Sequence, residues 1–143
     1  MSTRCMIKIE GLDPCIYKHS NGYPEGVVPV LRAFLPRFMK YRGWDPEYML
    51  ARLLGAFFEQ EKVDRAEFDA RREERGLMML VSEEDRAESN CLGYGIEPTV
   101  NHSDIEWLYV ITERRVLEVR QVREAFGVSL DVKDTKVTKR IKF

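Results

Sequence analysis

His19 and His102 are the two histidines of the chain, and each lies among polar residues of types that bind ligands or metals. His102 is followed at alternate positions by Asp104 and Glu106. Alternate residues of a β-strand point to the same face of a sheet, so this spacing places an imidazole and two carboxylates side by side. Such groups suit Zn²⁺, Mn²⁺ or non-haem iron, and His19 could add a second nitrogen. The metal hypothesis requires His19 and His102 to lie within a few ångströms of each other.

Plain alternation also explains the segment around His102 without any ligand. A strand from Ile105 to Ile111 that turns its apolar side chains to a core turns the intervening polar side chains to solvent. We therefore favour a structural role for His102, Asp104 and Glu106, and keep them as candidate binding residues.

The segment around His19 runs from Tyr17 to Gly26 and reads Tyr-Lys-His-Ser-Asn-Gly-Tyr-Pro-Glu-Gly. Its Asn-Gly pair favours a turn, and Pro24 restricts the preceding residue to extended geometry. The segment thus leads from a strand into a helix at one end of a sheet, where binding residues often lie. Each residue type here also has a role in a turn, and this structural interpretation is favoured. The candidate binding residues of the segment are His19, Asn21, Tyr23 and Glu25.

Together and in this order, the two segments resemble those of an uncharacterised family common in bacterial and phage genomes. Its members carry Tyr-x-His-x-Asp-Gly-Tyr-Pro-Glu-Gly and, later, Gly-Tyr-Gly-Ile followed by His-x-Asp-Ile-Glu-(Tyr/Trp)-Leu-Tyr. Residues 5–40 and 92–111 carry the resemblance, which implies no particular activity. The chain departs from the pattern at Asn21, where the family has Asp. A turn role survives this change, whereas a catalytic carboxylate would be lost, so the first segment is interpreted as structural.

Length and composition are those of one globular domain. A chain of 143 residues can bury one core, and its net charge of −1 gives no general attraction to nucleic acid or membranes. The three cysteines lack C-x-x-C spacing, so neither a disulfide framework nor a zinc knuckle is indicated. No apolar run is long enough to span a bilayer or to form a signal peptide. We expect a single cytoplasmic domain of residues 1–143 that has no membrane partner.

The elements expected around the two segments alternate between strands and helices. Two β-prone runs, 4–10 and 15–19, predict a hairpin. Apolar residues at helical spacing predict helices over Pro29–Tyr41, which Pro36 should kink or split, and Pro46–Glu61, which Asp45 should cap. The charged residues 64–75 predict a further, solvated helix that ends at Gly76.

Strands are expected again in the C-terminal half of the chain. Residues 105–111 and 116–119 should pair antiparallel, residues 128–132 alternate as a strand does, and residues 137–143 are typical of an edge strand. The apolar run 77–81 fits either strand or helix. Strands at both ends with helices between them predict a two-layer α+β domain, in which helices cover one face of an antiparallel sheet.

Three functions remain open. The chain has no P-loop, dinucleotide fingerprint, H-E-x-x-H or G-x-S-x-G motif, so we expect a non-enzymatic protein without a cofactor. The resemblance to the bacterial and phage family implies that it is a phage or mobile-element accessory protein. It would bind an unknown protein or a small ligand, as a monomer or a dimer. The alternative is a hydrolase of nucleotides or nucleic acid, with a divalent metal on His102, Asp104 and Glu106 and with His19 as ligand or base. A nucleic-acid-binding module that uses the basic residues 133–142 is less favoured, because no stacking aromatic residues accompany them.

Overall fold

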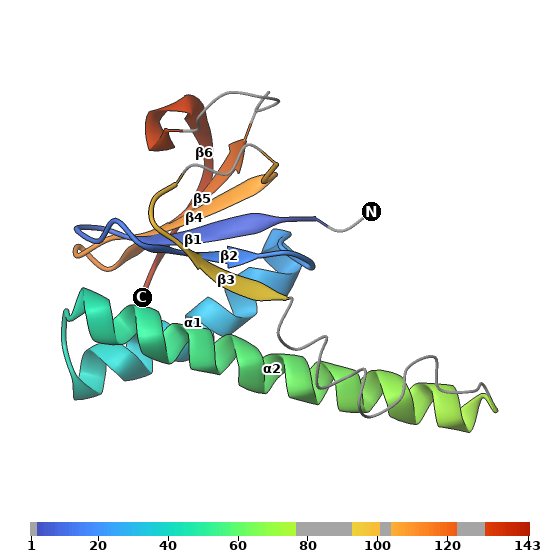
Figure 1. Cartoon of the computed structure of the whole chain (residues 1–143). Coiled ribbons are helices and arrows are strands. Elements are labelled where there is room, and N and C mark those ends of the chain that lie inside the picture. Colours follow the sequence, from blue (N-terminus) through green and yellow to red (C-terminus); the bar gives the residue numbers. More distant parts are fainter. Residues whose placement is uncertain (1–2, 77–92, 101–103, 123–130) are drawn as a thin grey trace.

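The computed structural model describes residues 3–76, 93–100, 104–122 and 131–143. Within these ranges the chain forms two α-helices and one sheet with the strand order β3-β2-β1-β4-β5-β6 (Figure 1). The elements are β1 (Cys5–Ile9), β2 (Cys15–Lys18), α1 (Pro24–Tyr41), α2 (Pro46–Glu74), β3 (Tyr94–Glu97), β4 (Trp107–Ile111), β5 (Val116–Val122), a 3₁₀ turn (Val132–Asp134) and β6 (Thr135–Lys142). The predicted α+β class is confirmed. Neither helix is long and apolar enough to cross a bilayer.

The sheet is mixed, which corrects the prediction of an antiparallel one. The β1–β2 hairpin and the antiparallel β4–β5 pair form as predicted, and β6 lies at the edge beside β5. The exception is β4, which pairs with β1 in parallel, Cys5 opposite Trp107 and Ile9 opposite Ile111. Parallel neighbours need a long crossover between them. Here the chain between β1 and β4 contains both helices, and sequence patterns could not show at which end of the sheet it returns.

Strand alternation divides the buried side chains between the two faces of the sheet. One face meets α1 and α2, which lie together on that side in Figure 1. This helix-side core joins Val27, Leu31, Leu35, Met39, Met49, Leu53 and Phe57 of the helices to Cys5, Ile7, Ile9, Ile16, Tyr109, Ile111, Leu117, Val119 and Ile141 of the strands. The opposite face carries a smaller outer cluster of Met6, Cys15, Val100, Ile105, Leu108 and Val110. The helices therefore cover one face, as predicted.

Both helices are longer than their patterns indicated. The helix α1 begins at Pro24 and continues through Pro29 and Pro36, so of the two outcomes predicted for Pro36, a kink or a split, the split does not occur. Its buried residues recur along the whole length, and their packing supports the helix across both prolines. The helix α2 is continuous where two helices were predicted, because i,i+4 contacts such as Gln60–Asp64 bridge the proposed gap.

Asp45 precedes α2 but does not cap it as predicted. Its carboxylate makes no hydrogen bond to the start of the helix and instead accepts one from Nε of Arg42, at 2.8 Å. Gly76 adopts a positive φ of 66° directly after the end of α2, as expected of a terminating glycine.

The C-terminal predictions were met only in part. The edge strand is confirmed as β6. Most of the predicted strand 128–132 lies outside the described residues, and Val132 belongs to the 3₁₀ turn instead. The run 77–81 also lies outside them.

Candidate functional site

The two segments singled out in the sequence meet at one end of the sheet. The strands β2 and β3 pair antiparallel, Lys18 opposite Tyr94, and the backbone N–H of His19 donates to the carbonyl of Gly93 at 3.0 Å. On the other side, the buried hydroxyl of Tyr109 in β4 donates to the carbonyl of Gly22 at 2.7 Å. Gly93, where the second segment starts, and Tyr109, where it ends, thus both contact the first segment.

The turn that leads into α1 explains several residues of the first segment. Asn21 has a φ of 53°, a left-handed conformation that Asn and Asp tolerate better than most residues. A Cβ atom on Gly22 would lie 2.8 Å from the backbone nitrogen of Cys5, and one on Gly26 would lie 2.7 Å from the carbonyl oxygen of Asn21. Close backbone contacts therefore require both glycines, and this geometry supports the structural interpretation of Asn21.

A cavity of about 820 Å³ lies on the helix side of this end of the sheet. The strand ends and the turn contribute Lys18, Tyr23 and Tyr94 to its wall. The middle of α2 contributes apolar rings and carboxylates, among them Phe57 and Glu61. The wall thus combines aromatic surface with charged groups, and it draws on residues of both segments.

Lys18 is the buried charged residue of this wall. Its side chain is only 8% exposed, and its Nζ donates to the hydroxyl of Tyr94 at 3.2 Å while lying 4.9 Å from the centre of that ring. Burial lowers the pKa of Lys18, and the negative charges of Glu61 and Asp64 partly oppose this effect. Burial also raises the pKa of Tyr94, so its hydroxyl stays protonated and can donate to a further acceptor.

A second polar cluster lies on the opposite face of the same strands. The hydroxyl of Tyr17 is 3.3 Å from Nδ1 of His19, and Nη1 of Arg4 forms an ion pair with Asp104 at 2.9 Å. Burial and the nearby carboxylate of Asp104 raise the pKa of Tyr17, while the charge of Arg4 lowers it. Since Asp104 acts on the tyrosine that contacts His19, these two predicted site residues belong to one neighbourhood.

The metal hypothesis finds limited support in this neighbourhood. His102 lies outside the described residues, so its distance from His19 stays a prediction. The strand β4 begins at Trp107, later than expected, so Asp104 and Glu106 precede it and do not share a strand face. Both are exposed, and Asp104 pairs with Arg4. Among the residues that the structure describes, no three His, Cys, Asp or Glu side chains are grouped so as to hold a metal ion.

The other predicted residues lie around the start of α1. Tyr23 precedes the first helical residue, is partly exposed and lines the cavity. Glu25 lies in the first turn and is exposed. The structure therefore places Asn21 and Tyr23 at the cavity and His19 and Asp104 at the opposite face.

Sequence reasoning missed Lys18, Tyr94 and Glu61. One signal was present, because Lys18 stands two residues after Ile16 and so shares its core-facing side of the strand. A lysine on that side needs a polar partner. The partner comes from Tyr94, 76 positions further along the chain, which no local pattern indicates.

The chain was compared with protein-family models, curated proteins and solved structures, and none of them matches it. The family resemblance of the two segments therefore stays a prediction.

Proposed function

We propose that this protein is a non-enzymatic binding protein, of phage or mobile-element accessory type, that takes a small ligand in the cavity beside α2. The observation that carries the proposal is the composition of the cavity wall. Residues of both segments, Lys18 and Tyr23 from the first and Tyr94 from the second, line it together with α2. Its volume of about 820 Å³ is typical of a site for a small organic molecule.

The chemistry of the wall favours a ligand with a flat apolar part and a hydrogen-bond acceptor. The rings of Phe68 and Tyr94 offer apolar surface to the flat part, and the buried ring of Phe57 packs against Tyr94. The ammonium group of Lys18 and the hydroxyl of Tyr94 are donors that a carboxylate or carbonyl oxygen would accept from. An aromatic carboxylate combines both features and is therefore the ligand class we propose.

Binding of aromatic carboxylates can be tested by amide chemical shifts in the ¹⁵N-labelled protein. We expect a fragment set of such acids to shift the amides of Gly93, Tyr94 and Ser20, and a Lys18→Met variant to bind about tenfold more weakly, because a hydrogen bond to a charged group is lost. Lys40→Met, at an exposed lysine near the end of α1, is the matched control and should bind like the wild type. Failure of every acid to shift these amides at millimolar concentration would refute the proposal.

Metal content tests the non-enzymatic part of the proposal. One equivalent of a divalent metal in the purified protein, absent from a His102→Ala variant, would overturn it in favour of the metal-assisted hydrolase. The proposal expects no bound metal, and the same content in His102→Ala as in the wild type.

A further inference from the structure

Three of the four cations of strand β6 have no acidic partner in the described part of the chain, whereas Arg140 pairs with Glu118. Lys136, Lys139 and Lys142 are exposed, and no hydrogen bond or ion pair joins them to any described residue. The strand itself contains no acidic residue. Arg114 and Arg115 are also exposed, in the turn between β4 and β5. We call these five residues the basic strip.

Several cations of α2 differ from those of the strip, because they pair with acidic residues on the same helix. These pairs are Lys62 with Glu59, Arg65 with Glu61 and Arg71 with Glu67. Such i,i+3 and i,i+4 pairs leave little net charge on the helix surface. Although the whole chain has a net charge of −1, the basic strip thus holds five cations without an ion pair to a described residue; the exposed Arg32, Arg37 and Lys40 of α1 also lack an ion pair with a described residue.

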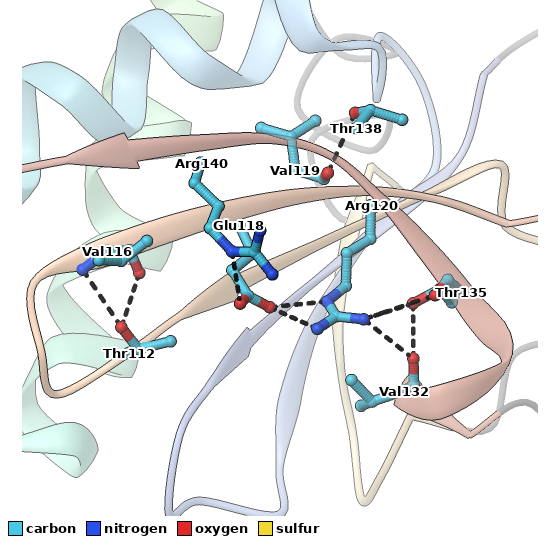
Figure 2. Close-up of polar contacts among 9 residues, drawn as sticks. All are labelled: Thr112, Val116, Glu118, Val119, Arg120, Val132, Thr135, Thr138 and Arg140. Carbon is cyan, nitrogen blue, oxygen red and sulfur yellow. Dashed lines mark hydrogen bonds and ion pairs between the residues drawn. The ribbon is translucent and has the colours of Figure 1, made fainter.

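Carboxylates lie near both parts of the strip. Glu113 stands next to Arg114 in the turn, where its N–H donates to Glu10 at 2.8 Å. The carboxylate beside β6, that of Glu118, is already bonded to other residues. Figure 2 shows Glu118 of β5 accepting from Nε of Arg120 at 2.8 Å while lying 3.5 Å from Nε of Arg140. Arg120 also donates to the carbonyl of Val132 and to the hydroxyl of Thr135. This network fixes β6 and the preceding 3₁₀ turn to β5, so the strip sits on an ordered part of the sheet.

The five cations follow one border of the molecule. In the described part of the chain β6 is one of the two edge strands, and its eight residues extend over about 26 Å. Lys142 pairs with Val116 of β5, and the neighbouring Phe143 donates its N–H to the carbonyl of Arg115 at 3.0 Å. The turn arginines therefore continue the line of lysines beyond the end of the strand.

We infer that the basic strip binds the phosphate backbone of double-stranded nucleic acid without reading its sequence. A duplex carries one negative charge per about 1.7 Å of its axis, so an extended row of cations meets several phosphates at once. Binding of single strands relies on exposed aromatic rings for base stacking. The strip has none, and Phe143 beside it packs against the helix-side core. This inference goes beyond the proposed ligand cavity and does not rest on it.

A rival explanation is that the lysines only protect an exposed sheet edge from pairing with another strand. That role accounts for Lys136, Lys139 and Lys142 but not for Arg114 and Arg115, which lie in a turn. It also predicts a different consequence of removing the lysines, namely association of the protein and no change in nucleic-acid binding.

Fluorescence anisotropy of a labelled 20-base-pair duplex, measured between 50 and 200 mM KCl, tests the inference. Five phosphate contacts predict a slope of about −4.5 for log K against log salt, and so a loss of about 500-fold in affinity over this range. Replacing Lys136, Lys139 and Lys142 by Gln should reduce the slope to about −1.8 and the loss to about 12-fold. The control carries the same charge change on exposed residues of α1: Arg32→Gln, Arg37→Gln and Lys40→Gln.

The result expected is that the β6 variant loses the salt-dependent affinity while the α1 variant and Lys18→Met keep it. Equal losses in the β6 and α1 variants would overturn the inference, since only overall charge would then matter. So would absence of duplex binding at 50 mM KCl, or equally tight binding to anionic lipid vesicles or to polyglutamate. A β6 variant that associates into oligomers and retains the wild-type slope would establish the edge-protection role instead.

Discussion

Removing the hydroxyl of Tyr109 should destabilise the protein by weakening the junction between its two segments. This hydroxyl is buried and donates to the carbonyl of Gly22 at 2.7 Å, across 87 positions of sequence. Tyr109→Phe keeps the ring, which packs in the helix-side core, so no large cavity is created. The change therefore isolates one hydrogen bond between β4 and the turn that leads into α1.

The size of the effect follows from what the variant leaves behind. A buried hydrogen bond contributes about 1 kcal/mol net, but an acceptor left without a partner costs about 1–3 kcal/mol. Gly22 is buried, so its carbonyl is poorly placed to accept from water instead. We expect Tyr109→Phe to lower the free energy of unfolding by about 2 kcal/mol, and the melting temperature by about 4–8 °C at this chain length.

Urea unfolding followed by circular dichroism measures this change directly. The m-value should stay constant, because the variant exposes the same surface on unfolding. Tyr41→Phe is the matched control, since Tyr41 is 79% exposed, and it should change the stability by less than about 0.5 kcal/mol. Faster hydrogen exchange of the amides in the turn would locate the effect. If Tyr109→Phe is as stable as Tyr41→Phe, the proposed junction contributes nothing and the reasoning is refuted.

Further predictions concern two glycines, two thiols and one amine. Gly22→Ala should destabilise the protein by more than about 2 kcal/mol, because the new Cβ would lie 2.8 Å from the backbone of Cys5. Gly55→Ala lies inside α2, where a Cβ meets nothing within 4 Å, and should stabilise the protein by about 0.5–1 kcal/mol. Urea unfolding of both variants checks the opposite signs. Burial raises the pKa of Cys5 to about 12 and that of Cys15 to about 11, so neither thiol should react with iodoacetamide at pH 8 unless urea is added. Mass spectrometry measures the alkylation of each cysteine. Rapid alkylation of Cys5 or Cys15 in the folded protein would contradict their burial. Burial lowers the pKa of Lys18 below its unfolded value of 10.5, so between the two pKa values the unfolded chain binds more protons than the folded one. The free energy of unfolding should therefore rise with pH in that window. If it rises as much in a Lys18→Met variant, other groups are responsible.

Local patterns predicted local elements well, and the limits of the prediction lie where distant residues decide. The β1–β2 hairpin and the β4–β5 pair follow from short β-prone runs joined by turns, and both were found. The continuity of α2 was not predicted, because the apolar helix Pro46–Glu61 and the charged helix 64–75 differ in pattern. The Gln60–Asp64 hydrogen bond and the Arg65–Glu61 ion pair join them.

The candidate site was predictable in position but not in chemistry. Asn-Gly and Pro24 correctly indicated a turn into a helix at the end of a sheet, and His19 and Asp104 do lie around Tyr17. Lys18 was overlooked because its partner Tyr94 belongs to a strand, β3, that no period-2 pattern announced. Short strands with central glycine leave little sequence signal, and their pairing is decided by the tertiary fold.

The parallel pairing that departs from the predicted antiparallel sheet is the one that assembles this end of the sheet. Because β4 runs parallel to β1, both strands start at the same end, where β2 also ends. Arg4, just before β1, therefore reaches Asp104, just before β4. An antiparallel β4 would start beside Ile9 and carry Asp104 to the opposite end of the sheet, away from Tyr17 and its neighbour His19. The direction of this one strand therefore determines whether Asp104 lies beside Arg4 and in the neighbourhood of His19.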